Sequence, residues 1–236
     1  AFEAARALCS AAMASSLLFA PRSRLVMIGD SVTDCNRARP VGEGLFDGIG
    51  RGYPMFVDAW LSVAYPELAV RVSNVGISGN TVRDLQARWQ TDVLDLKPDW
   101  VSVMIGVNDV WRQFDLPRQP ELSVAPDAYE AGLDDLVRRT LPHVRGLILL
   151  TPCYVEPSAA DAMRARMDEY GAIVRTVARR HGTVFVDTQA AFAPVLTHLH
   201  SAAIAWDRVH PNHIGHAVLA RAFLTAVGFD WTRLGR

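Results

Sequence analysis

Short apolar runs alternate with segments of helical periodicity along most of this chain. The runs are 25–28, 70–75, 100–105, 146–150 and 183–186. Apolar residues recur at helical spacing in 54–65, 81–96, 127–141, 161–180 and 213–227. Such runs, bounded by Gly, Pro or polar residues, are typical of buried strands. Their alternation with helices predicts an α/β fold with three α/β/α layers and a central five-stranded parallel sheet.

Polar residues follow the apolar runs at the points where the strands should stop. Asp30 and Ser31 follow the first run, 76–81 follows the second, and Asn108 follows the third. Asp207 and His210 stand just ahead of the last predicted helix. Because the carboxyl ends of parallel strands meet at one edge of a sheet, we expect a functional site there.

These polar residues are the types that nucleophilic catalysis requires. A serine needs a base, so Ser31 would be the nucleophile, His210 the base, and Asp207 the group that orients the imidazole. The backbone N–H groups of Ser31 and Gly79 and the amide of Asn108 would form an oxyanion hole. A serine in this position, taken in isolation, is more often a helix cap than a nucleophile, and it is the other clusters that favour catalysis by Ser31. Asp30 is expected only to brace the turn.

Composition and charge narrow the function further. The length of 236 residues is typical of one domain, which we expect over 23–236. The net charge of −1 argues against a nucleic-acid partner. The apolar stretch 13–20 is too short to span a membrane. Three separated cysteines form no disulfide framework, which favours the cytoplasm. Cys35, close to the predicted nucleophile, is expected to be a small buried residue rather than a reactive one.

Two further features of the sequence are its N-terminal segment and a group of histidines near the last predicted helix. Residues 1–22 are predicted to be an N-terminal extension, with Met13 as the natural start and 1–12 as an upstream remnant. His210, His213 and His216 recur every third residue, which suggests a metal site. That spacing rotates around a helix instead of sharing one face, so we expect no metal, and surface or capping roles for the latter two.

The motifs together resemble the four blocks of the GDSL, or SGNH, hydrolases. The blocks are Gly29-Asp-Ser31, Asn74-Val-Gly-Ile-Ser-Gly79, Gly106-Val-Asn108-Asp109 and Asp207-Arg-Val-His210-Pro. Longer stretches around them are similar to bacterial intracellular acetylxylan esterases, from about residue 25 to 231. The resemblance implies a flavodoxin-like fold and a cofactor-free, metal-free serine esterase. Its substrate would be a small acetylated carbohydrate, above all acetylated xylo-oligosaccharides, and the enzyme would form a homo-oligomer.

Aromatic residues near these blocks could stack on a sugar, and packing is an equal alternative for each. The candidates are Trp111, Trp206, Tyr53 and Phe46, the last two in or beside the Gly-rich loop 36–53. Arg112 should line the same cleft, because 106–113 is expected to be a loop over the site. Other functions stay open: a lysophospholipase, thioesterase or arylesterase of the same family, or a catalytically silent carbohydrate-binding protein.

Overall fold

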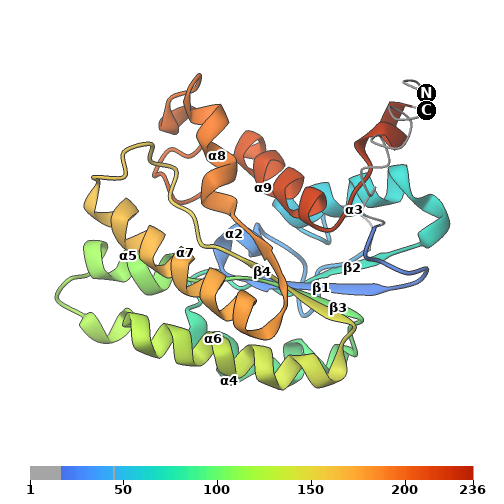
Figure 1. Cartoon of the computed structure of the whole chain (residues 1–236), viewed down its shortest axis with the longest axis horizontal. Helices are drawn as coiled ribbons and strands as arrows, with labels where there is room; N and C mark the ends of the chain where they lie inside the picture. Colours follow the sequence, from blue (N-terminus) through green and yellow to red (C-terminus); the bar gives the residue numbers. More distant parts are fainter. Residues whose placement is uncertain (1–16, 45, 236) are drawn as a thin grey trace, which may run out of the picture.

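The computed structural model describes residues 17–44 and 46–235, and they form a single five-stranded parallel sheet between helices (Figure 1). The strands are β1 (Arg24–Gly29), β2 (Arg71–Asn74), β3 (Trp100–Met104), β4 (Gly146–Leu150) and β5 (Val184–Val186). Their order in the sheet is β2-β1-β3-β4-β5. Leu25 of β1 pairs with Val72 on one side and Trp100 on the other, both in parallel register. The predicted three-layer α/β/α fold is thus confirmed.

Helices cover both faces of this sheet. The first face carries α3 (Tyr53–Ala64), α8 (Thr188–Leu196) and α9 (His213–Ala226), and the second carries α4 (Val82–Asp92), α5 (Val107–Asp115), α6 (Pro126–Thr140) and α7 (Ala162–His181). Along β1, Leu25 and Met27 enter the core under α3 and α9, whereas Val26 and Ile28 enter the core over α4, α6 and α7. Side chains alternate between faces of a strand, so a continuous apolar run is required where both faces are covered.

The remaining helical elements of the described residues are short. They are α2 (Ser31–Asp34) and the 3₁₀ turns η1 (Pro66–Leu68), η2 (Leu94–Leu96), η3 (Pro120–Leu122), η4 (Leu141–His143), η5 (Ser201–Ala203) and η6 (Trp231–Gly235). The helix predicted to run to residue 96 is therefore broken, because α4 ends at Asp92 and a 3₁₀ turn follows.

The structure corrects the prediction of a loop over residues 106–113. This segment is the helix α5, which begins after Gly106, a residue with φ of +129°. Apolar residues do recur here at helical spacing, at Val107, Val110, Trp111 and Phe114. This periodicity overlaps the polar motif around Asn108, which favours the interpretation as a loop. Helix α8 was also missed, because Pro194 lies inside it and reads as a helix breaker.

The start of the described chain packs on the domain. Phe19 is buried and its ring meets Trp100 edge-on at 5.7 Å, while the Leu18 N–H donates to the Val227 carbonyl. Leu17 and Phe19 of the expected extension thus pack against the core. The rest of it, with the predicted start at Met13, lies outside the described residues. Among the helices that the structure describes, none is both long and apolar enough to cross a membrane.

Candidate active site

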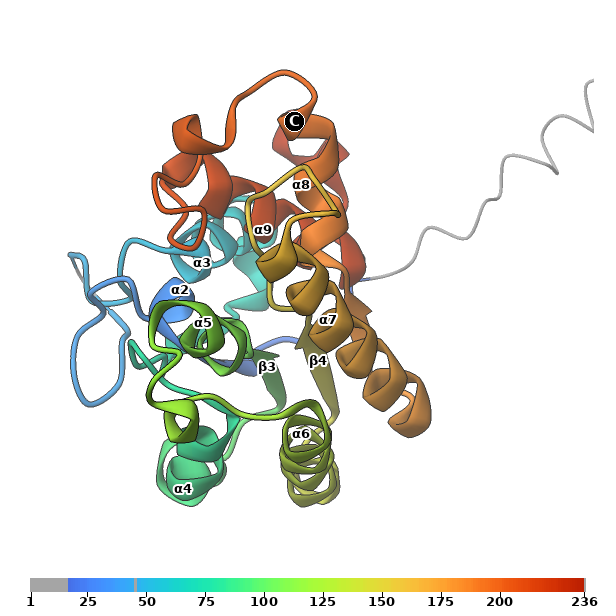
Figure 2. The ribbon, with the colours of Figure 1, turned by 90° about the vertical axis from the view of Figure 1, so that its left-hand side faces the viewer.

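The strand β1 delivers Ser31 to the carboxyl edge of the sheet. Figure 2 looks onto this edge, with α5 in front of the strands. The buried Asp30 caps α2, because its carboxylate accepts a hydrogen bond from the Val32 N–H at 3.0 Å. This is the bracing role expected for Asp30. The cap starts the helix at Ser31, and so places the serine hydroxyl beside a helix N-terminus at a half-exposed position.

His210 and Asp207 complete a hydrogen-bonded chain with Ser31. The Ser31 Oγ lies 2.9 Å from His210 Nε2, and His210 Nδ1 lies 2.6 Å from Asp207 Oδ2. An ionised carboxylate can only accept, so Nδ1 carries the proton and Nε2 of the neutral ring presents its lone pair to the serine. The structure thus brings together residues that are 179 positions apart.

Asp207 is held in this orientation by the backbone. Its Oδ1 accepts from the N–H groups of Val209 and His210, at 2.9 and 2.8 Å. Partial burial by itself would raise the pKa of Asp207, but the hydrogen bonds from the backbone and from the imidazole outweigh it and lower the pKa below its usual value. Asp207 therefore stays ionised beside the imidazole.

Gly79 and Asn108 face the same cleft, which has a volume of about 500 Å³ and also includes Ser31 and His210. Gly79 has φ of +84°, a conformation that favours glycine. The Asn108 side chain donates from Nδ2 to the Asn80 carbonyl at 3.0 Å. Ser31, Gly79, Asn108 and His210 therefore meet in one cleft, and Asp207 joins them through its hydrogen bond with His210.

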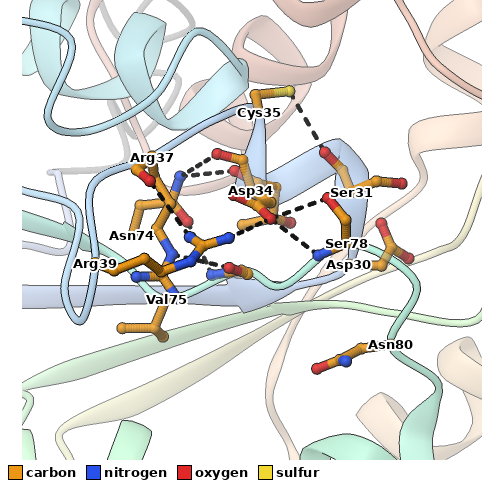
Figure 3. Close-up of polar contacts among 12 residues, drawn as sticks. Asp30, Ser31, Asp34, Cys35, Arg37, Arg39, Asn74, Val75, Ser78 and Asn80 are labelled. Carbon is orange, nitrogen blue, oxygen red and sulfur yellow. Dashed lines mark hydrogen bonds and ion pairs between the residues drawn. The ribbon is translucent and has the colours of Figure 1, made fainter.

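Asp34 ties the serine helix to the turn that carries Gly79 (Figure 3). Its Oδ2 accepts from the backbone N–H and the hydroxyl of Ser78, each at 2.9 Å, and from Arg39 at 2.7 Å. Burial would raise the pKa of Asp34, and the bonds from Arg39 and Ser78 more than offset this and lower it. The sequence motifs do not single out Asp34. Its only local signal is its place one helical turn after Ser31.

The predicted substrate-binding residues differ in whether they line the cleft. Trp111 lines the cleft and meets the His210 ring edge-on at 5.7 Å, and Arg112 also lines the cleft. Trp206 and Phe46 are 88% and 99% exposed and are not among the residues that line it. Tyr53 is wholly buried, with its hydroxyl 3.3 Å from Thr33 Oγ1, so the prediction that it contacts substrate is wrong. As the first residue of α3, it points into the core.

His216 is also buried, contrary to its predicted surface or capping role. Its Nδ1 accepts from the Tyr53 N–H at 3.1 Å, and its Nε2 lies 3.2 Å from Cys35 Sγ. Burial lowers the pKa of His216 to about 4 and raises the pKa of the Cys35 thiol to about 12. Neither group is therefore charged at neutral pH. Across 17–44 and 46–235, no three His, Cys, Asp or Glu side chains are grouped to hold a metal ion.

A comparison with known protein families identifies the family to which the chain belongs. The model of the GDSL-like Lipase/Acylhydrolase family matches residues 27–218. The chain belongs to this family, and its sheet and helices form the SGNH hydrolase fold. It is a carboxylic ester hydrolase.

Three named proteins are similar to this chain over most of its length. An acetylxylan esterase of Geobacillus stearothermophilus is 58% identical over 210 residues, which are 89% of this chain and 96% of the relative. The crystal structure of Axe2, an acetylxylan esterase from the same organism, matches with a TM-score of 0.90 and 56% identity over 91% of this chain and 98% of Axe2. LAE5, an alpha/beta hydrolase enzyme from the metagenome of Lake Arreo, Spain, matches with a TM-score of 0.89 at 56% identity, over 91% of this chain and 99% of LAE5.

Proposed function

We propose that this protein removes O-acetyl groups from carbohydrates, with acetylated xylo-oligosaccharides as its main substrates. The observation that carries this proposal is the chain from Ser31 Oγ through His210 to Asp207, with distances of 2.9 and 2.6 Å. In it the serine oxygen has a base within hydrogen-bond reach, and the base is itself oriented.

The first half of the reaction forms an acetyl-enzyme. Ser31 Oγ attacks the acetyl carbonyl as His210 Nε2 takes its proton, and the carbonyl oxygen becomes negatively charged. The Asp207 carboxylate stabilises the imidazolium that results. His210 then returns the proton to the sugar oxygen, so the C–O bond breaks and the sugar leaves as an alcohol.

The second half releases acetate. A water attacks the acetyl-Ser31 carbonyl while His210 takes its proton, and that proton passes to Ser31 Oγ as the ester bond breaks. In both halves the N–H groups of Ser31 and Gly79 and the Asn108 amide donate to the oxyanion. Each such donor contributes about 10²- to 10³-fold to turnover.

The relatives support the same residues and substrate. Solved structures of Axe2 include three that are described as catalytic mutants, with a serine, an aspartate or a histidine replaced by alanine. The serine and histidine replaced there are 179 positions apart and the aspartate precedes the histidine by three, as for Ser31, Asp207 and His210. Axe2 is also described as an acetyl-xylooligosaccharide esterase.

The decisive experiment follows acetyl loss from acetylated xylo-oligosaccharides by proton NMR. We expect acetate to appear as the ring-proton signals of acetylated positions disappear. In parallel, acetyl and octanoyl nitrophenyl esters are compared, and we expect the acetyl ester to react faster. A clear preference for the octanoyl ester would favour a lipase-like or thioesterase function. Absence of an organophosphate adduct on Ser31 in the folded protein would favour a silent binding protein.

The homo-oligomeric state and the cytoplasmic location remain predictions. Size-exclusion chromatography with light scattering tests the first, and an elution at the monomer mass of 25.9 kDa would contradict it.

A further inference from the structure

The guanidinium of Arg112 contacts the amide of Asn108, one turn earlier in α5. Arg112 Nη2 donates to Asn108 Oδ1 at 3.1 Å, and Asn108 Nδ2 donates to the Asn80 carbonyl at 3.0 Å. A guanidinium can only donate and a carbonyl can only accept. The two contacts therefore allow a single orientation of the amide. The bond to Asn80 uses one of the two amide hydrogens and leaves the second for the cleft.

Arg112 is itself held in place. Its Nη1 donates to Asp115, and its guanidinium lies 4.8 Å from the centre of the Trp111 ring. Asn108, Trp111, Arg112 and Asp115 share one face of α5, because they follow each other at spacings of three, one and three residues. The Arg112 side chain is only 22% exposed. Its charge is thus held against the Asn108 amide instead of moving freely in solvent.

We propose that Arg112 is a positioning residue for the oxyanion hole. It holds the Asn108 amide with Nδ2 toward the cleft, and its positive charge polarises that amide as a donor. Without Arg112, Oδ1 loses its donor and the amide can turn, which would aim oxygen lone pairs at the developing negative charge. Arg112 then acts through Asn108 and not through the direct substrate contact that the sequence suggests. This inference rests on the role of Asn108 in the proposed function.

The test is a double-mutant cycle between Arg112→Met and Asn108→Ala, measured with nitrophenyl acetate. We expect Arg112→Met alone to lower kcat by about tenfold with an unchanged KM, because only the transition state carries the oxyanion. In the Asn108→Ala background, Arg112→Met should lower kcat by less than about twofold, since the group that it positions is gone.

Two further variants separate positioning from general damage. Arg112→Lys should recover part of the lost kcat, because an ammonium can donate to Oδ1 but cannot bridge to Asp115 as a planar fork does. Arg138→Met is the matched control: Arg138 is an exposed arginine of α6 that pairs with Asp134 in the same helix, and its loss should leave kcat unchanged. Thermal unfolding of every variant shows whether it is folded.

Two results would overturn the proposal. One is an equal loss of kcat on removing Arg112 with and without Asn108. The other is a rise in KM that persists in the Asn108→Ala background, which would assign Arg112 to direct substrate contact. Nitrophenyl acetate keeps this test separate from the proposed substrate. Failure to deacetylate xylo-oligosaccharides would refute that substrate and leave the cycle interpretable.

Discussion

At the scale of the residue, two histidines six positions apart have opposite roles because different atoms contact their ring nitrogens. The Nδ1 of His210 faces a carboxylate, so its Nε2 is a free base toward Ser31. The Nδ1 of His216 accepts from the Tyr53 N–H, so the proton of the neutral ring sits on Nε2, toward Cys35. The first histidine is exposed and poised as a base, whereas the second is part of the core.

The triad can be tested by single substitutions. Ser31→Ala and His210→Ala should each lower kcat by at least about 10⁴-fold, because nucleophile and base act as a unit. The free energy of unfolding should change by less than about 1 kcal/mol, since both side chains face the cleft. Asp207→Asn should lose about tenfold less activity, because proton transfer to His210 remains possible. Steady-state kinetics and urea unfolding measure both quantities, and a His210→Ala enzyme with a tenth of the wild-type kcat would contradict the assignment.

At the scale of the element, the site depends on how closely the end of β1 approaches its neighbours. A Cβ on Gly29 would lie 2.3 Å from the Met104 carbonyl oxygen of β3 and 2.4 Å from Thr33 Oγ1 of α2. Only glycine fits there. The absence of a side chain lets α2 start directly against the sheet, and so sets the position of Ser31.

Gly29→Ala should therefore separate β1 from β3 and displace α2. We expect a loss of about 2–4 kcal/mol in the free energy of unfolding, from overpacking against backbone, together with reduced kcat. Gly182→Ala is the control. Gly182 caps α7 with φ of +65° and its Cβ would meet open space, so only about 1 kcal/mol and no activity should be lost. Equal losses in the two variants, measured by urea unfolding, would show that close packing at Gly29 is not the cause.

At the scale of the whole molecule, buried titratable groups under the site link stability to pH. The pKa of both Asp30 and Asp109 is raised to about 7, chiefly by burial, and the charge of Asp109 contributes to the rise at Asp30. In the unfolded chain both carboxyls titrate near pH 4. Between pH 4 and 7 the folded state thus binds more protons, and these two groups make stability fall as pH rises. His216, with its pKa lowered to about 4, acts in the opposite direction over the same range.

The contribution of Asp109 can be isolated with Asp109→Asn. As pH rises from 4.5 to 7.5, the wild type loses stability through ionisation of the buried Asp109, whereas an amide at this position cannot ionise. The free energy of unfolding of the variant relative to the wild type should therefore increase by on the order of 2 kcal/mol over this range. Urea unfolding at a series of pH values measures this difference. The exposed Asp95→Asn variant should show none. A difference that stays flat or declines with pH would contradict a raised pKa at Asp109.

The sequence alone predicted the five strands, the helices α3, α4, α6, α7 and α9, and the sheet edge at which Ser31, Gly79, Asn108 and His210 gather. It could do so because burial imposes a local periodicity on each element, and because parallel strands all end at the same edge.

Which side chains touch one another depends on the packing of the folded chain. The burial of Tyr53 and His216 follows from how α3 and α9 lie against the core and each other. The hydrogen bonds that Ser78 donates to Asp34 join segments 44 positions apart. The contact between Arg112 and Asn108 needed α5 to be a helix. Such pairings depend on how elements pack against one another, and no periodicity within a single segment records that packing.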